Sequence, residues 1–270
     1  MSAQELHDKI LSLGPWHHDV EVAPGVRTVG TAPPGTYPPE FGTPSVIRPD
    51  EALAKLVKAI YPEGLAGRSV LDCACNAGGY LFAAARLGAG RCFGFDVREH
   101  WIRQARFLAE HLPSENIEFA TLDLASLPER RLAMFDMTLF NGIFYHLPDP
   151  ISGLRSAADH TKELLVVNTA AIPGPGHSLI LSRESEAEVM SGVHGLAWLP
   201  TGEGVLRAIL EWCGFPHARL GYEGPAAGNR RRIVILAARD AATFNYYDAG
   251  NARPGSGPRP GLLGRLFRRP

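Results

Sequence analysis

Acidic side chains close two neighbouring apolar stretches of the chain, and a turn of small residues follows the first. Asp72 lies near the end of the stretch 69–73, and Asp96 ends the stretch 91–96. The turn at 74–79 reads Ala-Cys-Asn-Ala-Gly-Gly and precedes a helical pattern. Small residues let a ligand approach the backbone closely, a helix N-terminus attracts an anionic group, and an acid at a strand tip can accept the hydroxyl protons of a ribose. These features predict a site for a nucleoside-containing cofactor.

The residues of this turn narrow the choice of cofactor. The turn lacks the Gly-x-Gly-x-x-Gly fingerprint of dinucleotide sites and the Gly-Lys-Ser of a phosphate-binding loop, which disfavours NAD and ATP. An acid at the start of the turn would repel a pyrophosphate, but it can orient an ammonium group directly or through water. S-adenosylmethionine, a nucleoside that carries an amino acid, is therefore the expected cofactor.

Residues 70–168 resemble the class I S-adenosylmethionine-dependent methyltransferases. The first motif of that family reads Asp/Glu-x-Gly-x-Gly-x-Gly, and its second strand ends in an acid. Ala74 and Asn76 stand where the first two glycines are usual. Asn tolerates the left-handed backbone region better than most residues, whereas Ala74 costs little free energy only if its φ is negative. This departure leaves a noncatalytic S-adenosylmethionine-binding protein as an alternative.

A narrower resemblance covers most of the chain, from Trp16 to about Arg239. The segments that carry it are Gly-Pro-Trp-His-His at 14–18, the turn at 75–80, the helix at 99–107 and Asn-Gly-Ile-Phe-Tyr-His-Leu at 141–147. These segments are similar to the subgroup that contains the tRNA wobble-uridine carboxymethyl-transferring enzymes.

Relatives in that subgroup transfer a carboxymethyl group from carboxylated S-adenosylmethionine, which requires cations for the extra carboxylate and a basic face for tRNA. Residues 29–49 contain only Arg48 as a cation, and lysine occurs only at positions 9, 55, 58 and 162. The arginine run at 230–232 could bind phosphates, but at the start of a strand it is more often a solvated edge. Methyl transfer to a small molecule or sugar is therefore favoured, with the tRNA-modifying reaction as the alternative.

The family resemblance implies a set of cofactor contacts at the strand ends. Asp72 and the turn would hold the methionine part, Asp96 the ribose and Asp123 the adenine edge, while apolar side chains would flank the adenine ring. An Asp in a loop often only caps a turn, and Trp101 is equally compatible with ordinary helix packing. The expected cofactor contacts are Asp72, Cys75, Asn76, Gly78, Asp96, Val97, Trp101, Asp123, Leu124 and Asn141.

Tyr145 and His146 follow the fourth strand of the resemblance, where an acceptor would meet the methyl group. Methyl transfer is an in-line displacement, so the enzyme aligns donor and acceptor and, for a hydroxyl, removes a proton. His146 is the candidate base; the alternative is a histidine that only shapes the loop. Tyr145 is expected to contact cofactor or acceptor. The Asp/Asn-Pro-Pro-Tyr signature of nitrogen methylation is absent here, which favours oxygen as the acceptor atom.

Two segments are expected to cover this site. Residues 173–201 form a long connection, and such a connection is usually functional or mobile. Together with the N-terminal segment it would arch over the cofactor, with an acceptor pocket lined by His17, His18, His194 and Trp198. Clustered histidines also suggest a metal, but no pair has the helical i,i+4 or Glu-flanked spacing of a metal site, so no metal is expected.

The apolar pattern supplies the elements that must position these residues. Strands alternate with helices from residue 69 onward, which predicts an α/β fold with a parallel, doubly wound sheet whose ligands bind beyond the carboxyl ends of the strands. The resemblance implies the Rossmann-like, seven-stranded sheet of class I methyltransferases. The expected strands are 20–22, 26–28, 69–73, 91–96, 117–121, 134–140, 163–168, 219–222 and 233–238, and the expected helices are 5–13, 50–60 with Asp50 as its N-cap, 80–87, 99–111, 151–160 and 201–213.

These elements suggest one domain with additions. We expect an N-terminal cap at 1–64, a methyltransferase domain at 65–240 with the inserted lid segment 173–201, and a flexible basic tail at 241–270. The chain is 45% hydrophobic, enough for an ample core, and its net charge of -1 makes nucleic acid an unlikely partner. We recognise no signal sequence and no membrane span, so a cytoplasmic protein without stable membrane anchoring is expected. The four cysteines are expected to be buried thiols, and the sequence specifies no oligomeric state.

Overall fold

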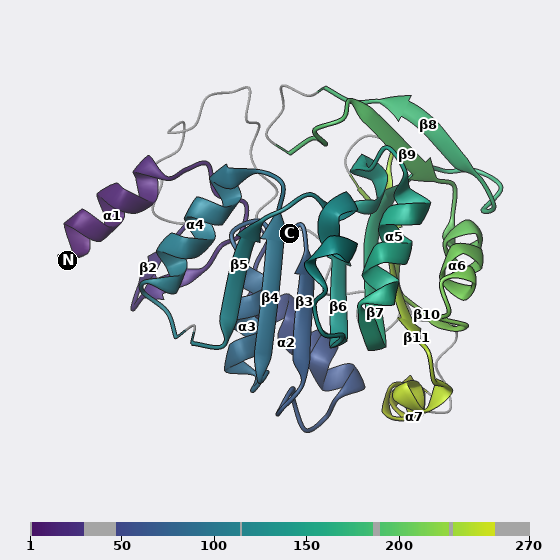
Figure 1. Ribbon diagram of the computed structural model, residues 1–270, viewed down its shortest axis with the longest axis horizontal. Helices are drawn as coiled ribbons and strands as arrows, with labels where there is room; N and C mark the ends of the chain where they lie inside the picture. The colour runs from purple at the N-terminus through teal and green to yellow at the C-terminus, as the bar shows by residue number, and fades with distance from the viewer. Residues whose placement is uncertain (1, 30–46, 114, 186–189, 227–228, 252–270) are drawn as a thin grey trace.

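A seven-stranded sheet forms the centre of the computed structural model (Figure 1). The structure describes residues 2–29, 47–113, 115–185, 190–226 and 229–251. The strand order is β10-β11-β7-β6-β3-β4-β5; β11 runs antiparallel to β7 and β10, and the other neighbours pair in parallel. The expected fold class is therefore confirmed. The strands are β3 (Ser69–Cys73), β4 (Arg91–Asp96), β5 (Ile117–Thr121), β6 (Phe135–Asn141), β7 (Thr161–Ala171), β10 (His217–Pro225) and β11 (Arg231–Ala238).

Helices cover both faces of this sheet because its central strands are apolar on both sides. All of β3 is buried. On one face, α2 (Pro49–Ile60) and α3 (Gly79–Arg86) share a core with alternate residues of the strands, and on the other face α5 (Pro150–Asp159) and α6 (Glu203–Trp212) do the same. The helix α4 (Glu99–Ala109) contacts β4 and β5. This layering leaves the ends of the strands as the place for a ligand.

The start of α2 differs from the expectation that Asp50 caps the helix. Arg48 is the N-cap, and Pro49 is the first helical residue. Proline favours that position because it has no N–H to leave unsatisfied and its φ suits a helix. Asp50 instead lies in the first turn, where its Oδ1 accepts a hydrogen bond from the N–H of Glu51 at 2.9 Å.

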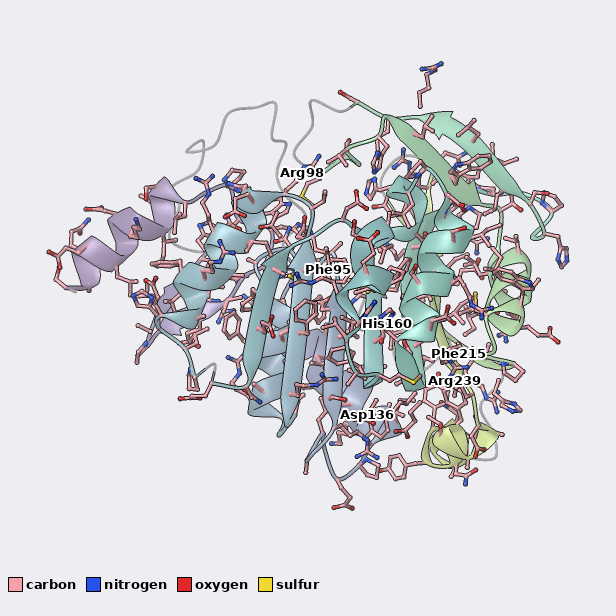
Figure 2. All side chains as sticks on the ribbon, viewed as in Figure 1. Phe95, Arg98, Asp136, His160, Phe215 and Arg239 are labelled. Carbon is pink, nitrogen blue, oxygen red and sulfur yellow. The ribbon has the colours of Figure 1, made fainter. Side chains whose placement is uncertain are left out.

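Structural contacts hold the amino-terminal ends of the parallel strands. Asp136, early in β6, accepts hydrogen bonds from the backbone N–H and the hydroxyl of Ser69, both at 2.7 Å. Close by, the guanidinium of Arg239 lies 4.4 Å from the centre of the Phe215 ring. Figure 2 shows Asp136 near the lower end of the sheet and Arg98 near the upper end. The carboxyl ends of the strands lie on the Arg98 side.

The N-terminal residues fold against α4. The helix α1 (Ala3–Ser12) begins with a capping box, and β1 (Glu21–Ala23) and β2 (Val26–Arg27) form the expected hairpin. Trp16 is fully buried, with its ring centre 6.2 Å from that of Phe107 in α4. Residues 30–46 of the expected loop lie outside the described residues.

The insertion contains two strands that the sequence pattern did not predict. The strands β8 (Leu179–Arg183) and β9 (Leu196–Pro200) pair antiparallel and lie above the carboxyl end of the sheet (Figure 1). Residues 186–189, between the two strands, lie outside the described part of the chain. The insertion is thus a hairpin that reaches over the edge where a ligand is expected.

The expectation of a flexible tail from residue 241 is wrong for residues 241–251. They form a 3-10 helix, η4 (Ala241–Phe244), and a short helix, α7 (Asn245–Asn251), with Phe244 and Tyr247 buried in the core. Two aromatic side chains close to the last strand outweigh the polar composition of this segment. Residues 252–270, including the predicted basic tip, lie outside the described residues. Among the described helices, none is long and apolar enough to cross a membrane.

Candidate functional site

A cavity of about 810 Å³ lies at the carboxyl ends of the parallel strands. Its volume is in the range that holds small-molecule ligands. The strand ends, the N-terminal segment with the start of α2, and the loop at 190–194 of the insertion wall the cavity. The expected site residues found in this wall are His17, His18, Asp72, Asn76, Asp96, Val97, Trp101, Asp123, Leu124, Asn141, Tyr145, His146 and His194.

Asp72 and Asp96 bring two carboxylates into the floor of the cavity. Their exposed fractions are 1% and 7%. Burial raises the pKa of Asp72 well above its ordinary range, and the charge of Asp96 raises it further. Burial raises the pKa of Asp96 to about 6, against the opposing hydrogen bonds from the N–H groups of Arg98 and Asn76. Within the described residues Asp72 Oδ2 has no hydrogen-bond partner, so a cationic ligand group can be accommodated there.

The turn after β3 uses left-handed backbone conformations at alternate positions. The φ angle is 59° at Ala74, 52° at Asn76 and 73° at Gly78. Ala74 therefore does not meet the expectation of a negative φ, and its Cβ costs roughly 1–2 kcal/mol in this conformation. The N–H of Asn76 donates to Asp96 Oδ2 at 3.1 Å. This hydrogen bond ties the turn directly to the acid at the end of β4.

Two of the expected cofactor contacts lie behind the cavity wall. Cys75 is 1% exposed, and its side chain points toward Gly94 of β4, where a Cβ would lie 3.0 Å from the sulfur. Gly78 is the N-cap of α3 and lies against the ring of Phe119. Neither residue lines the cavity, because the turn directs Ala74 and Asn76 toward the cavity and Cys75 toward the neighbouring strand.

His18 is a structural partner of α3 as well as part of the wall. Its Nδ1 accepts a hydrogen bond from the N–H of Gly79 at 3.2 Å. Burial lowers the pKa of His18 well below its ordinary range, and His17 lowers it further, so the ring is neutral at pH 7 and able to accept. A Cβ on Gly79 would lie 3.0 Å from this nitrogen. The sequence predicted that the N–H groups at the start of α3 are available to a ligand. One of them, that of Gly79, is instead hydrogen-bonded within the protein.

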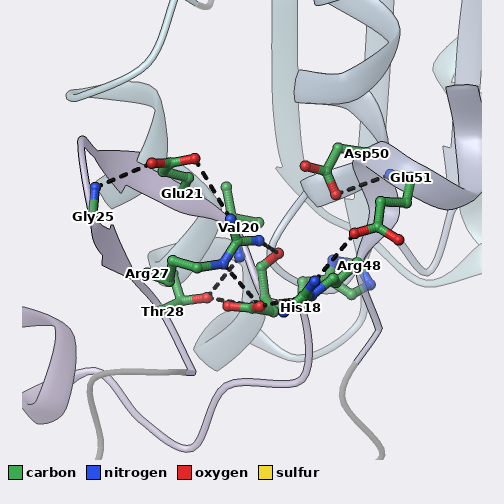
Figure 3. Close-up of polar contacts among 10 residues, drawn as sticks. His18, Val20, Glu21, Gly25, Arg27, Thr28, Arg48, Asp50 and Glu51 are labelled. Atoms are coloured by element: carbon green, nitrogen blue, oxygen red, sulfur yellow. Dashed lines mark hydrogen bonds and ion pairs between the residues drawn. The ribbon is translucent and has the colours of Figure 1, made fainter. Parts of the chain in front are cut away.

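Polar contacts fix the N-terminal segment that carries His18 (Figure 3). The hydroxyl of Thr28 donates to the His18 carbonyl at 2.6 Å and accepts from the N–H of Val20 at 3.0 Å. Asp19 Oδ2 lies 2.9 Å from Arg27 Nε and 3.3 Å from Arg48 Nε. The second ion pair connects this segment to the start of α2, so the two elements form one continuous side of the cavity.

The end of the cavity assigned to adenine combines apolar and acidic groups. Val97 is 42% exposed, and Trp101 is buried with its ring centre 4.7 Å from that of His100. Asp123 caps the 3-10 helix η2 (Leu124–Arg130): its Oδ1 accepts from the N–H of Ala125 at 2.8 Å. The other oxygen, Oδ2, lies 3.9 Å from His194 Nε2. Asp123 is therefore a cap, the alternative that the sequence left open, and it still presents its second oxygen beside the cavity.

Tyr145 and His146 lie on the 3-10 helix η3 (Phe144–His146), just after β6. Their ring centres are 3.9 Å apart. His146 Nδ1 lies 2.6 Å from Glu184 Oε2, which comes from the insertion. Glu184 was not predicted as a site residue, because 38 positions of the chain separate it from His146.

Two further residues of the cavity wall were not predicted as site residues. Asn168 pairs in register with Asn141 across β6 and β7, and its Oδ1 has no hydrogen-bond partner within the described chain. Arg232 lines the cavity, with its guanidinium carbon 5.9 Å from the centre of the Tyr145 ring. It takes part in no ion pair among the described residues, whereas the neighbouring Arg231 pairs with Glu223 at 3.2 Å. Strand alternation could have identified Arg232, since it lies on the same face as the buried Val234.

Trp198 is placed differently from the expectation that it lines the acceptor pocket. It is absent from the cavity wall, and its indole Nε1 donates to the Pro148 carbonyl at 3.1 Å. Because Trp198 lies within β9, the pleat of the hairpin decides which way it points. Trp198 therefore anchors the hairpin to the loop that follows His146.

Comparison with known proteins agrees with the fold. Residues 65–186 match the family model described as a methyltransferase domain. The chain is 31% identical over 152 residues to a tRNA U34 carboxymethyltransferase of Campylobacter hominis, covering 55% of this chain and 50% of that protein. A protein of the same description from Campylobacter concisus is 32% identical over 151 residues, covering 55% and 49%. The chain spans about half the length of the curated relatives it matches.

Solved structures show the same fold at low sequence identity. The N-terminal domain of EvdMO1 with SAH bound superposes with a TM-score of 0.69 at 23% identity, covering 88% of this chain and 97% of that chain. Magnesium protoporphyrin IX methyltransferase from Synechocystis with bound SAM gives a TM-score of 0.51 at 18% identity, covering 71% and 79%.

The matched family model and the strand order together define a class I S-adenosylmethionine-dependent methyltransferase domain. Residues 65–186 of this chain thus form a methyltransferase domain of that class, whose cofactor is S-adenosylmethionine. The residues at the strand ends fit that group: the unpartnered Oδ2 of the buried Asp72 suits an ammonium, and Asp96 stands at the strand tip where a ribose binds.

The backbone of the turn leads to a prediction about stability. Replacing Ala74 by glycine removes the left-handed strain but adds freedom to the unfolded chain, so we expect Ala74→Gly to raise the free energy of unfolding by about 0.5–1 kcal/mol. Ala77, in the same turn, has no positive φ and is fully buried, so Ala77→Gly should lower the free energy of unfolding. Urea unfolding of the cofactor-free variants measures both changes, and a destabilised Ala74→Gly would contradict the strained geometry.

The raised pKa of Asp96 predicts a pH dependence of stability. The folded protein holds this proton to about pH 6, whereas the unfolded chain releases it near pH 4. The ionised carboxylate therefore costs stability as the pH rises through this window. Between pH 4 and pH 7 we expect the free energy of unfolding of the cofactor-free protein to fall by roughly 2–3 kcal/mol relative to that of Asp96→Asn. Urea unfolding measures this difference. A difference that does not change with pH would show that Asp96 titrates normally.

Proposed function

We propose that the protein transfers a methyl group from S-adenosylmethionine to a hydroxyl of a small molecule or sugar. The observation that carries the proposal is that His146 and Tyr145 line the same cavity as Asp72, Asp96 and Asp123. Acids that suit a cofactor and a ring that suits proton removal thus line one cavity.

The residues of the cavity divide into two groups by their chemistry. Asp72 would hold an ammonium and Asp96 a ribose, while Val97, Trp101 and Asp123 would surround the adenine. When bound, the cofactor supplies an electrophilic methyl group on sulfur. His17, His194, Asn168 and the η3 residues remain for the acceptor. His18 and Trp198 support the wall through their hydrogen bonds to Gly79 and Pro148.

His146 is the residue proposed to accept the proton of the acceptor hydroxyl. Its Nδ1 is engaged by Glu184, so Nε2 is the nitrogen that can receive a proton. Proton removal by a positioned side chain contributes typically 10²–10⁴-fold to a rate. Deprotonation would make the acceptor oxygen a better nucleophile, and transfer would require the cavity to align that oxygen with the methyl group. The new O–C bond would form as the bond from carbon to the sulfonium sulfur breaks, leaving S-adenosylhomocysteine.

Isotopically labelled S-adenosylmethionine tests this proposal. The protein is incubated with the labelled donor and either an extract of its host or a panel of sugars, and products are identified by mass spectrometry. D-fucose is a suitable first sugar, since EvdMO1 was crystallised in the presence of SAH and D-fucose. We expect His146→Ala to lower kcat by about 10²-fold or more without weakening cofactor binding, and Asp96→Ala to abolish cofactor binding.

His177→Ala is the matched control for the histidine variant. His177 belongs to the same insertion, is exposed and lies outside the cavity wall, so its removal should leave kcat within twofold. Full activity of His146→Ala would exclude His146 as the base. Unchanged cofactor affinity of Asp96→Ala would exclude Asp96 as a cofactor contact. Absence of labelled product from every extract and sugar would favour a protein that only binds the cofactor.

Carboxymethyl transfer to tRNA is a second candidate, supported by the tRNA U34 carboxymethyltransferases among the relatives and by Arg232. The sequence disfavours this reaction because it offers few cations for the carboxylate of the donor and for a tRNA-binding face. Arg232 would supply a cation for the carboxylate, because it lines the cavity beside Tyr145 and is in no ion pair within the described residues. A planar guanidinium is well suited to a carboxylate.

A comparison of two donors separates the candidates. For carboxymethyl transfer, we expect kcat/KM with carboxylated S-adenosylmethionine and tRNA to exceed that with the ordinary donor, and Arg232→Met to reduce that preference about tenfold or more. Arg231→Met is the control, because Arg231 points to Glu223 outside the cavity. Preference for the ordinary donor, unchanged in Arg232→Met, would exclude the second candidate.

A further inference from the structure

A buried carboxylate from the insertion contacts the proposed base. Glu184 directly follows β8, and its Oε2 lies 2.6 Å from His146 Nδ1. The exposed fractions of the two side chains are 9% for Glu184 and 15% for His146. The pair is therefore largely shielded from water, where a hydrogen bond to a charged group is stronger than on an exposed surface.

The same oxygen of Glu184 has a second partner. The N–H of Gly192 donates to Oε2 at 2.9 Å. A Cβ on Gly192 would lie 2.8 Å from the carbonyl oxygen of His146, so only glycine fits this close approach. Gly192 lies in the middle of residues 190–194, the stretch of the insertion that walls the cavity. One carboxylate oxygen thus contacts both the base and the wall that faces it.

The surroundings keep Glu184 ionised. Burial by itself raises the pKa of this carboxyl, but the hydrogen bond and charge of His146, the N–H of Gly192 and the charge of Arg230 hold it below its ordinary value. A carboxylate has no proton to donate, so Nδ1 must supply the proton of the shared hydrogen bond. Nε2 of a neutral His146 is then left without a proton.

We propose that Glu184 is a positioning residue for the reaction: it holds His146 in the Nδ1-protonated form and closes the acceptor side of the cavity. This inference rests on the proposed methyl transfer and deepens it by assigning a role to the insertion. Trp198 supports this role, because its hydrogen bond to Pro148 attaches the second strand of the hairpin to the same loop. The hairpin therefore contacts the η3 loop through Trp198 of β9 and through Glu184, the residue that follows β8.

Two substitutions separate the charge of Glu184 from its geometry. Glu184→Gln keeps an oxygen that can accept from Nδ1 and from Gly192, but it removes the negative charge. We expect its acceptor KM to stay within about twofold, its kcat to fall about tenfold or more, and the acidic limb of its pH profile to move to lower pH, because the protonated ring loses its counter-charge. Glu184→Ala removes both partners, so we expect a larger fall in kcat and a raised acceptor KM.

Nitrogen NMR of the histidine rings tests the inference independently of turnover. In protein labelled with ¹⁵N-histidine, we expect the His146 ring of the wild type to be the Nδ1-protonated tautomer above the pH at which it titrates, and this preference to be lost in Glu184→Ala. Glu203→Gln is the control: Glu203 pairs with Arg207 on α6, away from the cavity, and should change neither the tautomer nor the kinetics.

The outcomes distinguish this inference from the proposed function. A His146 tautomer that is the same in the wild type and Glu184→Ala would overturn the positioning role, whatever the activity. Loss of the tautomer preference without any labelled product would leave the positioning role standing while methyl transfer fails. A changed KM with an unmoved pH profile in Glu184→Gln would also count against the role, because it would mean that Glu184 only shapes the wall.

Discussion

The burial of two carboxylates at the ends of β3 and β4 is the constraint on which the rest of the site depends. Asp72 and Asp96 are almost completely covered, and each charge disfavours the other. The fold offsets part of this cost by directing the N–H groups of Asn76 and Arg98 at Asp96. Asp72 Oδ2 receives no such partner from the described residues. A cationic ligand group would remove this remaining cost, which links cofactor binding to the stability of the turn.

His18 and His146, both in the walls of the cavity, have different roles because their surroundings differ. His18 is buried beside another histidine, which keeps it neutral and lets it accept the N–H of Gly79 at the start of α3. His146 instead meets an ionised carboxylate at Nδ1, which leaves Nε2 as the ring nitrogen outside that contact. The N-terminal segment and the insertion are distant in sequence, yet each positions one element of the central domain. The walls therefore organise the site as well as cover it.

Most of the fold could be predicted from local patterns. The limits of β3, β4 and β5 were predicted to the residue, because each is a short stretch in which most residues are apolar or small and which turn or polar residues bound. Local patterns did not predict the structure where contacts between residues distant in sequence determine it. Phe244 and Tyr247 join the core of the sheet and order a segment whose composition is typical of a tail. The strands β8 and β9 stabilise each other, and β8 on its own is largely exposed and carries no strong pattern.

The sequence by itself determined where the buried acids of the cavity lie, since Asp72, the turn and Asp96 are placed by two consecutive strands whose ends must meet. Tertiary structure decided the part of the cavity around His146. The contact between His146 and Glu184, the entry of Arg232 into the cavity and the turn of Trp198 toward Pro148 join parts of the chain that are far apart. Residue types alone do not specify these contacts, because the direction of a side chain on a strand depends on register and on how an inserted hairpin lies over the sheet.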